Sequence, residues 1–381
     1  MPLKNVFKDS VPSGSREERQ KLLYQRFGVI GNPFPSAAQT SGHPHMPTQA
    51  DDRIDAAVKA FYDERNSQAI AITASQGIGK TNLLNAYEKE LREVLSPRGF
   101  FVIRYMADPE PSFDPLIRSI LECLHENDLL YRSIHALAEQ PVKSRELLFN
   151  LVRVGEVKTM LSALLKAYED SEDRLRTRLK LAERWLLGLP IRKEYQIELG
   201  VQFRLDTVES KTRALRDLVY FCAELKTLEG IFLLLDELEK QGGLSKTAII
   251  QYLSGLRALI DALPKYFFLM LALTPDALNR YREMLPALKG RLANVVELLP
   301  LQSEDESVQL MRFYTEVARE EAKKIAKASW GQPGKSALIN EQEARSAFRD
   351  LLRESLLKGV RQREYLERLH NKAQDLINAV I

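Results

Sequence analysis

The stretch that decides the fold is residues 74–81, ASQGIGKT, which directly follows the apolar run AIAIT at 69–73. The residues after it, NLLNAYEKELREVL (82–95), have the spacing of an amphipathic helix. A strand, a glycine-containing loop and a helix form the context in which backbone N–H groups and a helix N-terminus bind phosphate. The sequence therefore predicts a phosphate-binding loop here, although Ala74 stands where the usual pattern begins with Gly.

Each residue type in this loop has a chemical reason to be there. Gly77 and Gly79 allow special backbone dihedrals and a close approach of the main chain to phosphate. Lys80 would supply a mobile positive charge for the β- and γ-phosphates, and Thr81 a hydroxyl for Mg²⁺. Ala74 is acceptable if its φ stays negative. The residues expected to bind the nucleotide are Ser75, Gln76, Gly77, Ile78, Gly79, Lys80, Thr81 and Asn82. The alternative is a glycine-containing turn before an ordinary helix.

A second motif, IFLLLDELEK at 231–240, places two carboxylates at the end of an apolar run. Ligands bind at this end of the strands in open α/β sheets. Asp236 would hold Mg²⁺ through water, and Glu237 would polarise the attacking water as a general base. The alternative is a strand end with a solvated acidic turn, an interpretation that suits Glu239 and Lys240. Together with the upstream loop, the motif favours nucleotide hydrolysis.

Thr274 stands at the tip of the next apolar run, YFFLMLALT at 266–274. A polar side chain in this place can contact the γ-phosphate or orient water. The alternative is a helix cap, because Thr followed by Pro is a common way to begin a helix.

Arg291 comes just before the last apolar run, NVVELLPL at 294–301. An arginine here could reach a neighbouring subunit's γ-phosphate and stabilise charge in the transition state. Arg280 and Arg282 compete for this role. From the residues alone, a surface arginine is the favoured interpretation of Arg291.

The apolar runs also predict the fold class. Five candidate strands occur, at 69–74, 100–107, 230–237, 266–274 and 294–301, with a helical pattern at 246–265. Continuous apolar runs that alternate with helices are typical of a parallel sheet covered on both faces. We therefore expect an α/β protein with a parallel five-stranded sheet. Its expected parts are an N-terminal extension and nucleotide-pocket loop (1–50), an α/β core (51–301), a helical insertion (about 129–229) and a helical lid (302–381) interrupted by a loop at 329–336.

Composition limits the class of protein only loosely. Of 381 residues, 45% are hydrophobic and 28% charged, and the net charge of +3 neither demands nor excludes nucleic acid. The N-terminus does not resemble a signal peptide and no apolar run could span a bilayer, so we expect a cytoplasmic protein without membrane contact. Cys123 and Cys222 are expected as small core residues, since Cys and His show no metal-ligand spacing.

Taken in this order, the loop ASQGIGKT, the strand FLLLDE, Thr274 and Arg291 resemble the AAA+ ATPases, whose lid is also helical. Within them, the closest resemblance is to the initiator-like branch, which contains origin-recognition ATPases and transposition ATPases of the TniB type. GNPFPSA (31–37), RWLLGLPI (184–191) and the stretch at 215–240 are also similar to ATP-binding proteins of bacterial phage-defence islands such as BREX. The resemblance covers about residues 25–380 and implies ATP and Mg²⁺ as cofactors.

The resemblance further implies two arginine roles. In this family an arginine on a lid helix often senses the γ-phosphate, and VRQREYLERL (360–369) offers Arg363, with Arg361 as the alternative. Arg291 would complete the site of the neighbouring subunit in a homo-oligomer. Nothing after the lid resembles the winged-helix DNA reader of many initiator ATPases, so any contact with DNA is expected from the ATPase body, the insertion or a partner.

The expected function is thus an ATP-dependent switch or motor that acts on double-stranded DNA or recruits an effector protein, in phage defence or mobile-element control. The alternatives are a scaffold that binds ATP with little turnover and a signalling ATPase that senses a protein. The basic stretch RLRTRLK at 174–180 could contact DNA. A solvated charged helix face is the favoured interpretation, because acidic residues precede it closely.

Overall fold

The computed structural model describes residues 20–21, 23–36, 38–39, 42–325, 337–354 and 359–379, so the loop expected at 329–336 lies outside the described residues. The described chain forms two compact units. The first unit comprises residues up to Pro47, Ser75–Leu83 and the residues from Leu298 onward. The second unit comprises Thr48–Ala74 and Leu84–Glu297, and it contains the sheet.

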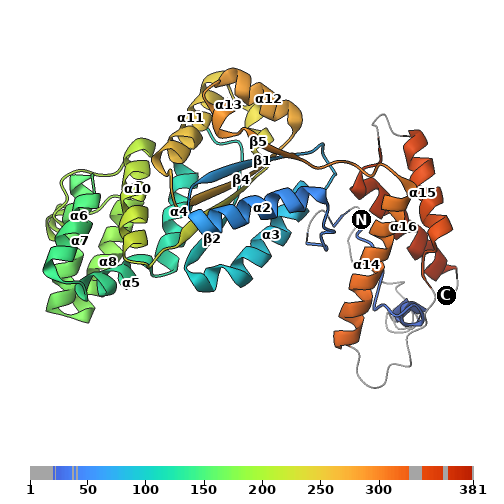
Figure 1. The fold of residues 1–381 in the computed structure, drawn as a ribbon, viewed down its shortest axis with the longest axis horizontal. Helices are drawn as coiled ribbons and strands as arrows, with labels where there is room; N and C mark the ends of the chain where they lie inside the picture. Colours follow the sequence, from blue (N-terminus) through green and yellow to red (C-terminus); the bar gives the residue numbers. More distant parts are fainter. Residues whose placement is uncertain are drawn as a thin grey trace, which may run out of the picture. The chain divides into compact units, whose positions relative to one another are not determined.

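The second unit is built on one five-stranded sheet in which every pairing is parallel, as predicted (Figure 1). The strands are β1 (Gln68–Thr73), β2 (Phe100–Met106), β3 (Gly230–Asp236), β4 (Phe267–Leu273) and β5 (Asn294–Glu297), in the order β2-β3-β4-β1-β5. β5 ends at Glu297, earlier than the predicted end at 301. Pro300 has no N–H for a ladder, and Leu301 instead forms an isolated antiparallel bridge with Val360.

Both faces of the sheet are buried, which explains its continuous apolar runs. All residues of β3 and β4 are buried. On one face, Phe61 of α2 (Gln49–Glu64) packs against Phe232 and Phe268, with ring centroids 5.1 and 5.4 Å apart. The alternate strand residues, such as Leu233, belong to the core cluster shared with the helices of the opposite face.

The helices agree with the alternating pattern of the sequence (Figure 1). The remaining helices of the second unit include α4 (Asp114–Glu126), α5 (Leu129–Ala138), α6 (Val142–Leu151), α7 (Gly155–Asp170), α8 (Glu172–Leu186), α9 (Lys193–Leu199), α10 (Val208–Glu224), α11 (Lys246–Ala262), α12 (Pro275–Met284) and α13 (Leu288–Arg291), with short 3₁₀ turns η2 (Ser96–Arg98) and η3 (Leu238–Gly243). α3 (Lys80–Val94) begins in the first unit and continues in the second. α5 to α10 make up the predicted helical insertion.

Buried polar contacts join the insertion to α4 and hold parts of the insertion to one another. Lys211 of α10 is fully buried and forms an ion pair with Asp114 at the start of α4. Asp217, also buried, accepts hydrogen bonds from the backbone N–H groups of Arg153 and Val154 at 2.9 and 2.7 Å. Because a buried charge without a partner is costly, these pairs restrict how the insertion can pack. Cys222 is a buried core residue as expected, and burial raises the pKa of its thiol to about 11.

The first unit has its own small core. Its helices include α14 (Glu304–Ile325), α15 (Glu341–Glu354) and α16 (Gln362–Asn378). Tyr24, Val29 and Phe34 of the N-terminal segment belong to the same core cluster as these helices. Tyr365 is buried in it and donates a hydrogen bond from its hydroxyl to the Ser307 carbonyl at 3.0 Å. In the described part of the chain, no helix has the length and apolar character needed to cross a membrane.

Candidate nucleotide site

The backbone of the loop between β1 and α3 has the conformation that glycine permits. Gly77 has a φ of 82° and Gly79 a φ of 109°, values that strain residues with a Cβ. α3 begins at Lys80, and its first turn is closed by a 2.9 Å hydrogen bond from Leu83 N–H to the Gly79 carbonyl. The N–H groups at such a helix start have no partner within the helix and attract anions. Lys80 and Ile78 are buried, Ser75, Gly77, Gly79 and Thr81 are half-buried, and Gln76 is exposed.

Ala74 has the negative φ that a residue other than glycine needs at the start of this loop. In the described part, the non-glycine residues with positive φ are Arg65, Asp128, Lys226, Glu237 and Tyr266, so Ala74 has a negative φ. Its side chain is 1% exposed, and its N–H donates to the Leu273 carbonyl at 3.3 Å. The start of the loop therefore lies beside the end of β4, directly before Thr274.

The beginning of α16 lies against the loop within the first unit. Arg363 N–H donates to the Gly77 carbonyl at 3.1 Å. A Cβ placed on Gly77 would lie 3.6 Å from Arg361 Cδ and 3.7 Å from Arg363 Cβ, and one on Gly79 would lie 3.3 Å from Gln362 Oε1. Both arginines suggested by the sequence are thus next to this loop. A Cβ at Gly77 would make only ordinary van der Waals contact with them, so the positive φ is what favours glycine there.

A short segment of the N-terminal extension, which the sequence predicts as a nucleotide-pocket loop (1–50), also reaches the loop at 74–81. The Pro44 carbonyl accepts hydrogen bonds from Asn82 Nδ2 at 3.0 Å and from the Tyr314 hydroxyl at 2.9 Å. His43 Nδ1 lies 2.5 Å from the same hydroxyl. Burial lowers the pKa of His43, and the charge of Arg363 lowers it further. Asn82 therefore holds this segment in place, in addition to any contact with a nucleotide.

The two strand-end carboxylates occupy different environments. Asp236 is fully buried, and its Oδ2 lies 2.6 Å from Arg104 Nη2 of β2. Its Oδ1 accepts the Glu237 N–H at 2.8 Å. The sequence analysis missed Arg104, although an arginine inside the apolar strand FFVIRYM is a signal that a buried acid lies nearby.

Glu237 has a strained backbone. Its φ of 57° and ψ of 28° are left-handed, a conformation that costs a residue with a Cβ about 1 kcal/mol or more. Its carboxylate lies 2.6 Å from Lys240 Nζ. Strain of this kind is found at functional positions, where the surrounding structure enforces it.

The segment after Glu237 is fixed by buried contacts. Gln241 is fully buried, donates to the Asp108 carbonyl and accepts the Glu110 N–H at 3.2 Å. The Tyr281 hydroxyl donates to the Leu238 carbonyl at 2.8 Å. These contacts maintain the left-handed turn at Glu237.

Thr274 caps α12. Its side chain accepts the Ala277 N–H at 3.3 Å, and Pro275 occupies the first helical position. The hydrogen bond with Ala277 is the contact expected if Thr274 is a helix cap. The O–H donor of Thr274 is separate from this contact and has the chemistry to bind a phosphate oxygen or water.

Arg291 is bound within its own chain. Its guanidinium donates to both oxygens of Asp261, at 2.7 and 3.0 Å, and to the Ala287 carbonyl at 2.9 Å. Arg282 donates to the Leu292 carbonyl, and Arg280 lies over the Tyr281 ring, 5.2 Å from its centroid. An arginine finger at Arg291 would have to exchange Asp261 for the phosphate of a neighbour.

The basic stretch of α8 forms local contacts. Arg174 pairs with Asp170 at 2.8 Å and Arg176 with Glu172 at 2.9 Å. Arg178 donates to the Ala163 carbonyl at 2.9 Å. Lys180, the last cation of the stretch, is exposed. These contacts favour a solvated helix face over a DNA-binding surface.

Comparison of the chain with protein-family models gives no matching family, and comparison with curated proteins gives no match. Among the described residues, no group of three or more His, Cys, Asp or Glu is gathered to hold a metal ion. The interpretation of the site therefore rests on its own residues and on their geometry.

Proposed function

We propose that the protein binds ATP with Mg²⁺ and hydrolyses its β–γ bond with water as the nucleophile. The observation that carries this proposal is the conformation of the loop, in which positive-φ Gly77 and Gly79 lead into a helix that begins at Lys80. The parallel sheet supports it, because β1 and β3 end at the same edge, where Ala74 and Asp236 stand.

The residues suit the proposed ligands. Loop N–H groups and the Lys80 ammonium are donors for phosphate oxygens. The Thr81 hydroxyl and the Asp236 carboxylate are hard oxygen ligands of the kind that Mg²⁺ prefers. When bound, the ion would neutralise charge that develops on the phosphates.

The roles of the strand-end residues follow from their contacts. Arg104 and the Glu237 N–H hold one oxygen of Asp236 each, so this carboxylate is oriented before any ligand arrives. Glu237 would take the proton of the attacking water, while Lys240 holds its carboxylate. Thr274 would orient that water or contact the γ-phosphate.

The arginines and the assembly complete the proposal. Arg363 would sense the γ-phosphate from the lid helix, and Arg291 would act on the site of a neighbouring copy in a homo-oligomer. ATP binding would favour assembly, and hydrolysis would release it. Action on double-stranded DNA or on an effector, in phage defence or mobile-element control, is proposed from the resemblance to initiator-like AAA+ ATPases alone.

One observation favours a second candidate, an ATPase that senses a protein partner. The insertion exposes large apolar side chains, namely Val142, Leu147, Leu151, Ile197 and Phe203. Exposed apolar surface marks protein contacts more often than DNA contacts, whose surfaces are polar and basic. The local pairing of the α8 arginines points in the same direction.

The experiment that tests the proposal is steady-state ATP hydrolysis across protein concentration, with and without duplex DNA, with Lys80→Ala as the control. A rate per subunit that rises with concentration and again with DNA supports a shared, DNA-linked site. A rate that rises with concentration but ignores DNA supports the protein-sensing candidate. Hydrolysis equal to that of Lys80→Ala in every condition contradicts the ATPase.

A further inference from the structure

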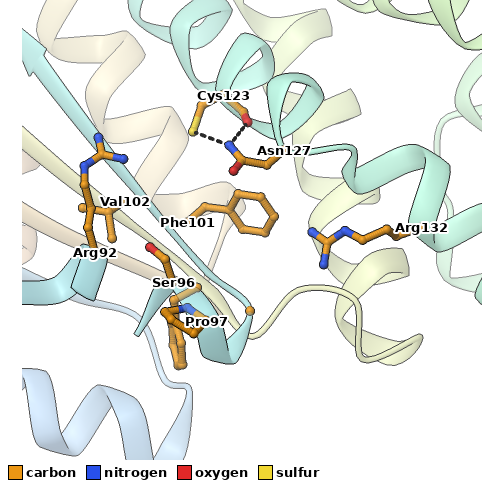
Figure 2. Close-up of a pocket in the computed structure, with 10 residues that line it drawn as sticks. Arg92, Ser96, Pro97, Phe101, Val102, Cys123, Asn127 and Arg132 are labelled. Carbon is orange, nitrogen blue, oxygen red and sulfur yellow. Dashed lines mark hydrogen bonds between the residues drawn. The ribbon is translucent and has the colours of Figure 1, made fainter. Parts of the chain in front are cut away.

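We propose that a cavity at the start of β2 is a binding site for a small organic phosphate, separate from the nucleotide loop. The cavity has a volume of about 260 Å³ (Figure 2). Its wall is formed by Arg92, Ser96, Pro97, Gly99, Phe100, Phe101, Val102, Cys123, Asn127 and Arg132. Phe100 begins β2, so the cavity lies at the opposite end of this strand from Met106, which pairs with Asp236.

The charge of the lining selects an anion. It contains Arg92 and Arg132 and no acidic residue. A guanidinium presents its N–H groups in a fork that matches the oxygens of phosphate and carboxylate groups. Two such groups from different helices, α3 and α5, face one cavity (Figure 2).

Arg132 is the stronger of the two ligands for an anion. Its guanidinium lies over the Phe101 ring, 5.9 Å from the centroid. Within the described part of the chain its side chain makes no ion pair and no hydrogen bond. A phosphate group would therefore gain charge-assisted hydrogen bonds from Arg132 without displacing an acid.

Arg92 supplies the other wall. Its Nε donates to Glu88 Oε1 at 3.0 Å, and Glu88 is not part of the lining. A guanidinium has five N–H donors, so donors remain for a ligand while this pair is kept. The Ser96 hydroxyl makes no side-chain hydrogen bond among the described residues and is a further donor.

The size and the apolar lining indicate an organic ligand rather than a bare ion. A volume of about 260 Å³ is far more than a single water or a bare ion needs. Pro97, Phe101 and Val102 provide apolar surface beside the arginines. Binding would be non-covalent, because hydrogen bonds from the guanidinium groups and apolar contact would hold the ligand.

The first test is calorimetric titration of phenyl phosphate into the Lys80→Ala chain. In this variant the nucleotide loop lacks the lysine proposed to bind phosphate, so binding at the loop should not obscure binding at the cavity. We expect saturable binding that Arg132→Gln and Arg92→Gln each weaken about tenfold or more. Arg98→Gln is the matched control, because Arg98 is on the adjacent turn, bonds the Tyr62 hydroxyl at 3.0 Å and does not line the cavity. Tighter binding of benzoate than of phenyl phosphate would overturn the choice of phosphate.

The second test needs no substitution in the cavity wall. Cys123 lines the cavity, whereas Cys222 is fully buried, so alkylation by iodoacetamide reports on Cys123. Phenyl phosphate should slow this alkylation in the unaltered chain, and it should do so equally when ATP is present in excess. Absence of protection, or equal affinity in the Arg132→Gln and Arg98→Gln chains, would overturn the site.

Discussion

The glycine-containing loop at 74–81 and helix α8 both carry basic residues, yet these residues have different surroundings in the two regions. Lys80 is 9% exposed and stands at the start of a helix, behind two glycines with positive φ. Arg174 and Arg176 have 67% and 62% of their side chains exposed, and each pairs with an acid four residues earlier in the chain. A basic residue that is buried at a helix start is costly unless an anion or a polar partner stabilises it. Exposed i,i+4 pairs need no such explanation.

Burial and position thus distinguish a charge proposed to bind a ligand from charges that keep a surface solvated. Removal of the buried charge should therefore weaken ATP binding strongly, and removal of the exposed charges should change little.

Lys80→Ala should have the largest effect. The loop would lose the charge proposed to bind the β- and γ-phosphates, so we expect ATP affinity to fall by about a hundredfold or more. Titration with a fluorescent ATP analogue measures this. Lys89→Ala, an exposed lysine on the same helix, is the control and should bind as the parent does. Equal affinity in both variants would show that the loop does not bind phosphate.

Glu237→Gln should bind ATP as the parent does and slow its hydrolysis by about 10²–10⁴-fold, the usual contribution of a general base. Single-turnover hydrolysis measures the step directly. Glu239→Gln alters an acid of the same turn and should keep most of the activity. If Glu237→Gln hydrolyses ATP at the parent rate, the general base is not Glu237.

Arg291→Ala should keep ATP affinity and lower turnover only where subunits assemble, because its guanidinium would act on a neighbouring site. Mixing it with Lys80→Ala should restore part of the activity at mixed interfaces. Arg257→Ala is a control, since Arg257 lies 3.4 Å from the same Asp261. If mixing restores nothing, the arginine does not act in trans.

Replacement of Arg174 and Arg176 by Gln should have the smallest effect. Loss of two exposed pairs should lower the free energy of unfolding by less than about 1 kcal/mol. Chemical denaturation measures the stability. Salt-dependent binding to duplex DNA tests the alternative that the stretch at 174–180 contacts DNA. A large loss of DNA affinity would show that these arginines do more than solvate the helix.

The sheet could be predicted from the sequence because its cause is local. A strand buried on both faces must be apolar throughout, so β3 and β4 stand out as runs such as FLLLD and FFLMLAL. The glycines of the loop are equally visible, because few other residues adopt their dihedrals.

The contacts between distant residues could not be predicted in this way. The Arg104–Asp236 pair joins positions far apart in the chain, and the Arg291–Asp261 pair does the same. A single sequence records that a charge exists but not which acid it meets. The Pro44 carbonyl that holds Asn82 carries no sequence signal, since every residue has a carbonyl.

The left-handed backbone at Glu237 has a consequence for how this protein can evolve. Asn adopts this conformation more easily than Glu, so a Glu237→Asn change removes strain and should stabilise the fold by about 1 kcal/mol. A population selected for thermal tolerance alone would drift toward Asn or Gly at this position. Persistence of glutamate there under such selection would support the catalytic role proposed for Glu237.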